Sequence, residues 1–514
     1  MTAERTIGGP QPLRPSGRLE AILAMVRDVV ARDERICLVG GAVRDMLLGR
    51  DSGRIDLDFA HHGDAAALAR RLADTAGGSF ALLHDDEKKV ARVVFDDGAV
   101  CDFSSMATAA IEDDLALRDF TINAMAVPVD RSAAPGEPAI IDPFGGRADL
   151  DAGIVRVVDE GAFAADPLRM LRAFRFAATL EFTIEAGTLA AITRRHELAA
   201  RPAPERSLRE LFLTLDCAGV APLVRGMDET GLLETLLPEI GPMRDQRQDG
   251  YHHLHVWEHS LAVLGELEGM LTDLAAACGE YAADVDACLG EELVPERTRR
   301  ALVKLVCLLH DVAKPATAEE RDGRLTFYSH DVEGARTMAA VARRLRLGQR
   351  ELAESELLVR RHLDPRGLFN AEASSQKTVM RFFRRLGESG VVVLLFSLAD
   401  VRAARGPLSD EVSLERAAAV TRRLIAEYYG SLRVQLETPP LLNGRDLMER
   451  FGLRPGPGLG ALLGQVREKQ LDGELLDRDE ALAFVADIVD KGAVPGAGSR
   501  PAPGFGEDRG ECRP

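Results

Sequence analysis

The sequence lacks the features that mark membrane proteins, secreted proteins and zinc ribbons. Its 514 residues contain no run of about 18 apolar residues, the length that a transmembrane helix needs. Residues 1–17 lack the apolar core of a signal peptide, so we expect a cytoplasmic protein with a short disordered leader. Seven cysteines are scattered without a CxxC pair. This usage argues for reduced thiols and against disulfides or a zinc ribbon.

The sequence also lacks an overall positive charge. Its formal net charge of −18, taken alone, counts against a nucleic-acid partner. A protein that binds a phosphate backbone nevertheless needs only local Lys/Arg density, not a basic chain. Such density occurs in four clusters: Arg169, Arg172 and Arg175; Arg297, Arg299, Arg300 and Lys304; Arg343, Arg344 and Arg346; and Arg381, Arg384 and Arg385. Each cluster is equally well explained as a solvated helix face, so charge alone leaves the class of partner open.

What the chain contains is the composition of an ordinary soluble protein. Hydrophobic residues make up 46% and charged residues 28%, which allows several buried cores. The length leaves room for about three domains. Seven of the eleven histidines lie between His252 and His362, and this shift in composition marks off the second half of the chain.

The stretch from Ile36 to Ala60 predicts a strand, a glycine turn, a helix and a second strand. The apolar run Ile36–Val39 has the length of a buried strand, and Gly40 and Gly41 follow it. A helical segment comes next and ends near Gly49. The double glycine allows backbone to approach a phosphate closely, with donors from the turn and the helix start facing the anion.

The second strand, Ile55–Phe59, alternates strictly between apolar and acidic residues. Side chains two apart on a strand point the same way, so Asp56 and Asp58 should converge on one point. Two adjacent carboxylates repel each other and call for a cation between them, for which a pair of Mg²⁺ ions is the obvious candidate. Paired glycines and Asp-x-Asp are each common alone. Their combination favours a metal-dependent phosphate site.

The segments GGAVRDMLLGR and DLDFA together resemble the first motif of the tRNA nucleotidyltransferase and poly(A) polymerase family, the class II CCA-adding enzymes. The resemblance implies that Asp56 and Asp58 bind two Mg²⁺ ions. It also implies that the glycine turn contacts the incoming triphosphate, with Arg44 and Asp45 beside it.

Two further segments extend this resemblance. Asp102, in VCDFSSM, stands where the family has a third acid, which would deprotonate and align the attacking 3′-hydroxyl. A surface strand aspartate is the plainer explanation of Asp102. Residues 114–124, DLALRDFTINA, resemble the motif D-x-x-R-R-D-x-T-I-N-A, with Leu117 in place of the first arginine. The residues that the family would assign to the triphosphate and ribose here are Arg118, Asp119 and Asn123.

Residues 165–176, ADPLRMLRAFRF, predict a helix with a proline at its start and Asp166 as its cap. Asp166 and Arg169 are three apart and would share a helix face. The segment resembles the family motif E-D-x-x-R followed by R-x-x-R-F, with alanine in place of the glutamate. The resemblance implies that Asp166 and Arg169 select the base by its Watson–Crick edge and that Arg172 and Arg175 continue the nucleotide-binding face. A surface ion pair is the plainer alternative.

The histidine-rich second half resembles the HD phosphohydrolase superfamily. The segments YHHLHVWEHSL, LVCLLHDVAKP and LLFSLADVRAARG carry the residues of this resemblance. It implies a divalent metal site at His259, His310, Asp311 and Asp400. His330 and His362 either extend the site to a second metal or are surface or packing histidines.

Taken together, the resemblance covers roughly residues 35–485 and implies an α+β protein. It predicts a nucleotidyltransferase (polymerase β-like) α/β head followed by an all-helical neck, body and tail. We expect a leader at 1–17, the head at 18–150, a neck with nucleotide-selection and RNA-binding elements at 151–245, an HD-type body at 246–440, a tail at 441–490 and a disordered C-terminus at 491–514.

The function implied is template-independent addition of C and A residues to the tRNA 3′ end from CTP and ATP, with Mg²⁺ and release of pyrophosphate. An additional phosphohydrolase activity would lie in the HD-type body. A poly(A) polymerase, or an enzyme adding only CC or only A, shares these motifs. A phosphohydrolase with an inactive head is a rival of another class, against which the intact head acids argue. A pure RNA-binding module would not need clustered acids. The oligomeric state stays open.

Overall fold

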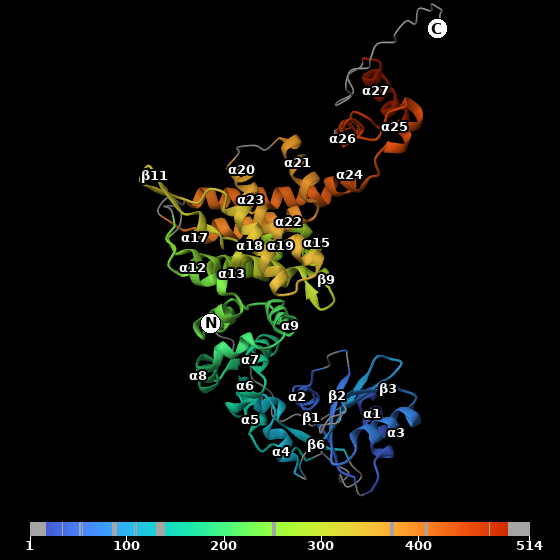
Figure 1. Cartoon of the computed structure of the whole chain (residues 1–514), viewed down its shortest axis with the longest axis vertical. Coiled ribbons are helices and arrows are strands. Elements are labelled where there is room, and N and C mark those ends of the chain that lie inside the picture. The colour runs from blue at the N-terminus through green and yellow to red at the C-terminus, as the bar shows by residue number, and fades with distance from the viewer. Residues whose placement is uncertain are drawn as a thin grey trace, which may run out of the picture. The chain divides into compact units, whose positions relative to one another are not determined.

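The computed structural model of the chain describes residues 17–32, 34–50, 53, 55–84, 90–106, 108, 110–129, 139–248, 253–370, 375–406, 410–471 and 473–491. The chain divides into two compact units (Figure 1). The first comprises Met1–Glu372 and Val391–Arg422, and the second comprises Ala373–Gly390 and Arg423–Pro514. The predicted leader, apart from Gly17, and the predicted disordered C-terminus, apart from Lys491, lie outside the described residues. Within the described part, no helix has the length and apolar character needed to cross a membrane.

The first unit begins with a six-stranded sheet in the order β3-β4-β5-β2-β1-β6. Its strands are β1 (Ile36–Val39), β2 (Asp56–His61), β3 (Ser79–His84), β4 (Val90–Val94), β5 (Val100–Ser105) and β6 (Ala126–Pro128). The pair β2–β5 is parallel, and the other neighbours in the sheet are antiparallel. The strands predicted at 36–39 and 55–59 are confirmed as β1 and β2, with the end of β2 two residues later.

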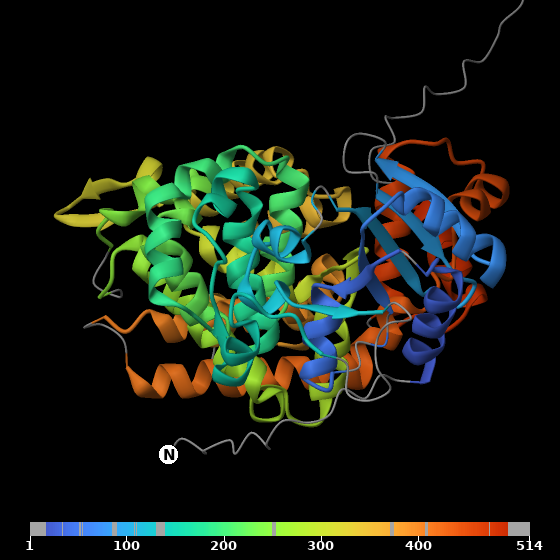
Figure 2. The same ribbon diagram turned by 90° about the horizontal axis from the view of Figure 1, so that it is seen from below.

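Helices pack on both faces of this sheet. They are α1 (Gly17–Val29), α2 (Gly41–Leu47), α3 (Ala65–Ala76) and α4 (Ile111–Ala116), with the 3₁₀ turn η1 (Thr121–Asn123). Leu115 of α4 packs with Cys37, Val39 and Ala60, on the sheet face opposite Phe59. Helix α3 packs on β3, β4 and β5, and α1 packs on α3 (Figures 1 and 2). The apolar side chains of β2 and β5 form the core beneath, where Phe59 and Phe103 stack with ring centroids 4.9 Å apart. Burial of one strand face leaves the other face of β2 for polar residues.

A run of short helices follows the sheet. Its elements are α5 (Gly146–Ala152), β7 (Ile154–Val155), α6 (Gly161–Ala165), α7 (Leu168–Leu180), β8 (Thr183–Ile184), α8 (Ala186–Arg195), η2 (His196–Ala200), α9 (Pro204–Leu215), α10 (Ala221–Glu229), α11 (Leu232–Leu236), η3 (Pro238–Ile240) and α12 (Gly241–Arg244). Helix α7 packs against α9 and α10 and buries Phe174 and Leu171. It therefore carries its arginines on the side that remains polar.

The rest of the first unit is a helical bundle with two small hairpins. Its elements are α13 (Val256–Thr272), α14 (Leu274–Cys278), η4 (Gly279–Tyr281), α15 (Ala282–Gly290), β9 (Glu292–Val294), β10 (Arg297–Thr298), α16 (Arg299–Leu309), α17 (Lys314–Thr317), β11 (Glu319–Arg321), β12 (Arg324–Thr326), α18 (His330–Arg344), α19 (Gln349–Arg361), α20 (Asp364–Asn370), α22 (Ser389–Ala403) and α23 (Glu411–Glu427), the last two extending into the second unit. Helix α16 packs against α13 and α19, and α18 pairs with α19. Helix α16 ends at Leu309, and Lys314 begins the short helix α17.

The second unit is helical as well. It holds α21 (Gln376–Leu386), the π-helical turn η5 (Tyr428–Leu432), α24 (Arg433–Glu437), α25 (Gly444–Phe451), α26 (Pro457–Leu471) and α27 (Arg478–Asp490). Its core joins α25, α26 and α27 through Leu447, Leu462 and Val485, which are fully buried. Asn443 caps α25 by accepting from the amides of Arg445 and Asp446, which is a favoured N-cap arrangement.

Candidate functional site

Strand β2 presents two carboxylates on the polar face of the sheet. Leu57 and Phe59 are buried, whereas Asp56 and Asp58 are exposed, so the structure places both acids on one strand face. Protein atoms around its carboxylate remove hydration and raise the pKa of Asp58 to about 6. The positive charge of Arg118 opposes this rise in the pKa of Asp58, and the negative charges of Asp56 and Asp102 add to it.

Asp102 lies directly beside Asp58, because the parallel register of β2 and β5 pairs the two residues. On its other side, β4 places Arg92 opposite Asp102. Arg92 donates from Nε to Oδ1 at 2.8 Å and from Nη2 to Oδ2 at 2.7 Å. This bidentate pairing raises the pKa of Arg92. Burial and the charge of Asp102 raise the pKa of Asp56.

These three carboxylates have the chemistry that a cation requires. Their mutual repulsion contributes to the raised pKa values of Asp56 and Asp58, and a bound cation would relieve it. They are not drawn into one tight cluster, however. Among the described residues, the groups of three acid or histidine ligands within 4.8 Å of one another lie in the helical bundle, and both oxygens of Asp102 bind Arg92.

Gly40 lies between Arg118 and Asp58. Its φ of 76° is one that L side chains rarely adopt. A Cβ at this position would lie 2.8 Å from Arg118 Nη1 and 3.4 Å from Asp58 Oδ2, so a side chain would displace the guanidinium. Arg118 Nη2 donates to Asp114 at 3.2 Å, while its buried Nε has no hydrogen-bond partner among the described residues. A buried donor of this kind suits an anionic ligand.

A chain of hydrogen bonds joins α2, η1 and α7. Arg44 binds the carboxylate of Asp45 from Nε and Nη2 at 2.9 and 3.0 Å and donates from Nη1 to Asn123 at 2.8 Å. Asn123 donates to Asp119 at 3.0 Å, and Arg172 donates from Nε to the other oxygen of Asp119 at 2.8 Å. Burial disfavours the charge of Asp119, but Arg172 and Asn123 outweigh it and lower its pKa. This series of hydrogen bonds therefore fixes these side chains relative to one another.

Asp166 and Arg169 have separate partners. Asp166 is extended and precedes α7, so it does not lie on the helix face that the spacing predicted. Its Oδ1 accepts from the amide two residues later at 3.1 Å, and its Oδ2 accepts from Arg206 at 3.2 Å. Arg169 donates to the backbone carbonyls of Leu117 and Arg118 at 2.8 and 3.3 Å. Arg169 thus ties α7 to the segment that carries Arg118.

Three guanidinium groups lie against the ring of Phe176, a residue for which the sequence predicted no role. The Cζ atoms of Arg175, Arg44 and Arg172 lie 4.2, 5.1 and 5.4 Å from its ring centroid. Such contacts are stabilising and hold the planar groups in place. Arg175 also donates to the buried Glu210 of α9 at 2.5 Å. The guanidinium of Arg175 is therefore engaged by Glu210 and Phe176 rather than open to a ligand.

The residues of the HD-type resemblance meet at one buried point in the bundle. His259 lies on α13, His310 and Asp311 follow α16, and Asp400 lies on α22; all four are at most 1% exposed. His259 Nε2 lies 2.9 Å from Asp400 Oδ1, and His310 Nε2 lies 3.1 Å from Asp311 Oδ2. Residues far apart in the chain are thus brought together.

His330 and His362 belong to the same cluster. Their Nε2 atoms lie 3.5 and 4.0 Å from Asp311 Oδ1. The ligand atoms of His259, His310 and Asp311 lie within 4.8 Å of one another, and those of Asp311, His330 and His362 do so as well. Asp311 is common to both groups. The structure therefore places His330 and His362 beside Asp311 rather than on the distant surface.

Backbone carbonyls orient three of these imidazoles. Nδ1 of His310, His330 and His362 donates to a carbonyl three residues earlier, at 2.9, 2.6 and 2.6 Å. This leaves Nε2, the atom that faces Asp311, as the lone-pair nitrogen that a metal requires. Burial lowers the pKa of His259 to about 4, that of His362 to about 3 and also that of His330, which favours neutral imidazoles at these three positions. At His310 burial acts in the same direction, but the carboxylates of Asp311 and Asp400 outweigh it and raise the pKa. The donor set fits a divalent metal.

Two cations border this cluster. Lys314 Nζ lies 2.6 Å from Asp311 Oδ2 and donates to Gln248 at 2.6 Å, and Arg366 donates to Asp400 Oδ2 at 2.9 Å. Burial disfavours both carboxylate charges, but the surrounding histidines and cations outweigh it and hold the pKa values of Asp311 and Asp400 well below their usual range. Both acids are therefore ionised.

Sequence reasoning missed several residues that the structure brings to these sites. Arg92 had a local signal, because it is the one charged residue in the strand VARVV. Arg206, Glu210 and Arg366 had none, because each meets its partner only through packing of helices distant in the chain.

Four family models match consecutive parts of the chain. They are described as "Poly A polymerase head domain" over residues 36–156, "Probable RNA and SrmB- binding site of polymerase A" over 181–243, "HD domain" over 256–404 and "tRNA nucleotidyltransferase domain 2" over 408–486. Their order follows the order of the elements described above.

Curated relatives match nearly the whole chain. The A-adding tRNA nucleotidyltransferase of Deinococcus radiodurans is 36% identical over 456 residues, which cover 87% of this chain and 94% of the relative. The CC-adding tRNA nucleotidyltransferase of Geobacter sulfurreducens is 35% identical over 451 residues, covering 87% and 90%. The "Multifunctional CCA protein" of Pseudomonas aeruginosa is 32% identical over a shorter part, 63% of this chain and 73% of the relative.

Solved structures share the fold. The Thermotoga maritima CCA-adding enzyme complexed with tRNA superposes with a TM-score of 0.61 at 21% identity, covering 93% of this chain and 97% of that one. A CCA-adding enzyme in complex with ATP gives a TM-score of 0.62 at 20% identity, covering 93% and 95%. Likeness at this level of identity extends to the fold.

Proposed function

This chain belongs to the class II family of tRNA nucleotidyltransferases, and from that premise we propose that it adds C and A residues to the 3′ end of tRNA from CTP and ATP, without a template. One observation carries the proposal: Asp56 and Asp58 share a strand face, with Asp102 in register beside them and Arg118 held against Gly40. We propose the cytoplasm, where tRNA is found, as the setting.

We propose that Asp56 and Asp58 hold Mg²⁺. When bound, the ions would supply Lewis-acid stabilisation to the phosphates and relieve the repulsion between the acids. Asp102 would accept the proton of the attacking 3′-hydroxyl, and Arg92 would orient its carboxylate through the bidentate contact. This arrangement supports loss of pyrophosphate by in-line displacement.

The triphosphate would lie against Arg118 and the backbone at Gly40 and Gly41. At Gly40 a side chain finds no room, because its Cβ would lie 2.8 Å from Arg118 Nη1. Arg44 and Asp45 would support this glycine turn, since Arg44 already binds both Asp45 and Asn123. Asp119 and Asn123 would connect it to Arg172 and so to the helix assigned to base selection.

Magnesium binding by the head is expected to weaken as the pH falls below about 6. The raised pKa of Asp58 means that protons and Mg²⁺ compete for its carboxylate in that range. Titration calorimetry of the protein without nucleotide should show the apparent Kd for Mg²⁺ rising by up to about tenfold per pH unit below pH 6 and levelling off above pH 7. A Kd that stays constant between pH 5 and pH 8 would contradict this assignment of Asp58.

Base discrimination is expected to depend on Arg169. If Asp166 and Arg169 read the base edge, Arg169→Ala should raise incorporation of UTP and GTP relative to CTP and ATP. Loss of a bidentate base contact costs roughly 1–3 kcal/mol of discrimination. The structure provides a matched comparison in Arg206→Ala, which removes the partner of Asp166 instead. Unchanged base preference with a raised KM for all four nucleotides would place Arg169 in support of Arg118, through its carbonyl contacts.

The decisive experiment uses tRNA transcripts that end at three positions: before the first C, after the second C, and after the terminal A. Each is incubated with CTP, with ATP and with both. The proposal expects two C residues and one A on the shortest transcript and no extension of the complete one. Incorporation of C alone, or of A alone on the CC-ending transcript, would assign the chain to the CC-adding or A-adding type. Repeated A addition would assign it to the poly(A) type.

The buried cluster of the bundle supports a second candidate function. We propose that His259, His310, Asp311 and Asp400, extended by His330 and His362, would hold a divalent metal, which would supply an activated water for hydrolysis of a phosphoester such as a 2′,3′-cyclic phosphate at a damaged tRNA end. The orientation of Nε2 atoms toward Asp311 favours it. In this assignment the head (18–150) and neck (151–245) carry nucleotide addition, the body (246–440) carries hydrolysis, and the tail (441–490) completes the chain.

A further inference from the structure

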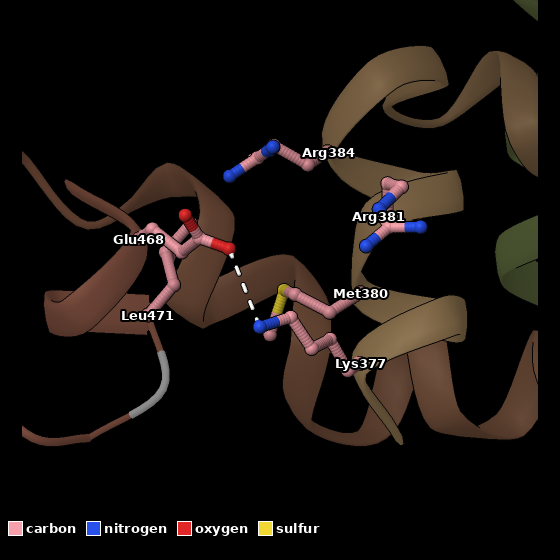
Figure 3. Close-up of a pocket in the computed structure, with 6 residues that line it drawn as sticks. All are labelled: Lys377, Met380, Arg381, Arg384, Glu468 and Leu471. Carbon is pink, nitrogen blue, oxygen red and sulfur yellow. Dashed lines mark ion pairs between the residues drawn. The ribbon is translucent and has the colours of Figure 1, made fainter. Parts of the chain in front are cut away.

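A polar cavity lies in the first unit, where the end of α9 and the loop after it meet helices α13, α14, α15 and α16. It measures about 250 Å³, close to the ~300 Å³ at which small-molecule sites begin. Figure 3 shows, for comparison, the hollow between α21 and α26 of the second unit, which measures about 10 Å³ and is spanned by the ion pair of Lys377 with Glu468. A space of that size holds a water molecule at most. Of the two, the cavity of the first unit has room for a ligand.

A buried ion pair forms one wall of this cavity. Lys304 of α16 is fully buried, and its Nζ lies 2.5 Å from Glu268 Oε1 and 2.6 Å from the carbonyl oxygen of Cys217, to which it donates. Glu268 of α13 also accepts from the amide of Ala221 at 3.3 Å. The charges of Lys304 and Glu268 therefore cancel, and the pair joins α16 and α13 to the segment between α9 and α10.

A second ion pair lies between the cavity and solvent. Arg300 stands one turn before Lys304 on α16, so the two basic side chains share a helix face. Arg300 donates from Nη2 to Asp286 Oδ1 of α15 at 2.6 Å. The Asp286 side chain is exposed and that of Arg300 is half-buried, which places this pair at the rim. Both basic residues of the lining are thus already neutralised by the protein.

The remaining charged residue of the lining, Asp216, has no cationic partner within the part of the chain that the structure describes. Its Oδ1 accepts a hydrogen bond from the hydroxyl of Thr298, a neutral group. Asp216 also stands at the C-cap of α9, where the helix macrodipole disfavours a negative charge. Neither neighbour compensates the carboxylate, and the cavity as a whole is left with a net charge of −1. A bound cation would neutralise it.

The apolar part of the lining indicates what kind of cation fits. Leu271 of α13 and Leu274 of α14 face the same cavity as Asp216. A bare inorganic cation would use the carboxylate and leave these leucines against water. An anion would add to the negative charge. A small organic cation satisfies both parts of the lining, because its charged end binds the carboxylate and its methylene groups leave water on the leucines.

We propose that this cavity binds a small organic ammonium ion, with its ammonium group on Asp216 and its aliphatic body against Leu271 and Leu274. The cavity shares no residue with the head acids or with the histidine cluster of the bundle. The site therefore goes beyond nucleotide addition and hydrolysis and depends on neither. A bound ion would contact α9, α13 and α14 at once, so it stabilises the folded protein in proportion to its occupancy.

The test uses n-butylammonium as the probe and the full chain without nucleotide or tRNA. Two ligands of the same length are its controls: n-butanol, which has no charge, and butyrate, which has the opposite charge. Titration calorimetry should show saturable binding of n-butylammonium alone, and the melting temperature should rise with its concentration. Ammonium chloride at equal ionic strength should bind at least about tenfold more weakly, since each buried methylene contributes about fourfold.

Two variants separate the charge from the apolar wall. D216N keeps the oxygen that accepts from Thr298 but removes the charge, and it should raise the Kd of n-butylammonium by about tenfold or more. L271A keeps every charge and should weaken n-butylammonium by several fold without changing the affinity for ammonium chloride. The matched control E280Q removes an exposed acid of the same unit that does not line the cavity, and it should leave the Kd unchanged. It corrects for the general attraction of cations to a chain of net charge −18.

Four results would overturn the proposal. They are an absence of saturable n-butylammonium binding, an equal Kd for the wild type and D216N, binding of n-butanol or butyrate as tight as that of n-butylammonium, and equal affinity for ammonium chloride, which would leave a bare cation site. Nucleotide addition by D216N should match the wild type. If the wild type adds no nucleotide but binds n-butylammonium through Asp216, the proposed function fails and the cavity site stands.

Discussion

Replacing Asp58 by Asn is expected to abolish nucleotide addition while leaving the protein folded. The same result is expected for Asp56→Asn and for alanine at either position. Asparagine keeps the shape of the side chain but removes the charge that would hold a metal against the triphosphate. Lewis-acid stabilisation is worth several kcal/mol, so turnover should fall by about 10³-fold or more. Steady-state incorporation of CTP and ATP into truncated tRNA measures the loss.

The pKa of Asp58 separates this loss from misfolding. Because its folded pKa is about 6, above the usual value of 3.8, the folded protein binds more protons than the unfolded chain between these limits. The stability due to this group is thus present at low pH and lost as the pH rises through 6. The metal-free Asp58→Asn protein should therefore be at least as stable as the wild type at pH 8. Asp96→Asn, an exposed acid of the same head, is the control and should keep full activity. Near-normal incorporation by a folded Asp58→Asn variant would contradict the metal assignment.

Replacing His310 and Asp311 together by alanine is expected to remove metal and phosphohydrolase activity and to leave nucleotide addition near the wild-type level. The two residues stand at the centre of the buried cluster, where Asp311 is shared by both ligand groups. They lie on the bundle, more than a hundred positions beyond the head acids. Metal analysis of the purified protein and hydrolysis of a 2′,3′-cyclic phosphate measure the effect.

Because His310 and Asp311 are buried, loss of folding has to be distinguished from loss of metal in this second experiment. Both side chains are at most 1% exposed, and their removal leaves Lys314 and Asp400 with fewer partners. Breaking a buried charged set commonly costs 3–5 kcal/mol, so a thermal melt accompanies the assay. Retained nucleotide addition reports a folded head. The control is His253→Ala/His255→Ala, which removes two exposed histidines near the same site. Equal metal content in the wild type and the His310/Asp311 variant would count against a metal centre at this cluster.

Local patterns predicted the parts of these sites that lie close together in the chain. Alternation in β2 was sufficient to place Asp56 and Asp58 on one face, because the direction of a strand side chain depends only on its position in the strand. The glycine turn and the third acid followed from motif resemblance. The HD-type ligands were found in the same way, as residue types with metal-binding chemistry in apolar helices.

The remaining contacts in the two candidate sites join segments that are distant in the sequence, and no local sequence pattern encodes such contacts. Arg92 meets Asp102 only through the register of β4 and β5, and Asp166 binds Arg206, 40 residues away, instead of continuing the helix face with Arg169. His259 meets Asp400 across 141 residues. A sequence pattern reports which side chains share an element, whereas packing of helices α13, α16, α18, α19 and α22 determines which elements share a site. The shared strand face of Asp56 and Asp58 could therefore be predicted from the sequence alone, but the contacts of Asp102 with Arg92 and of His259 with Asp400 required the fold.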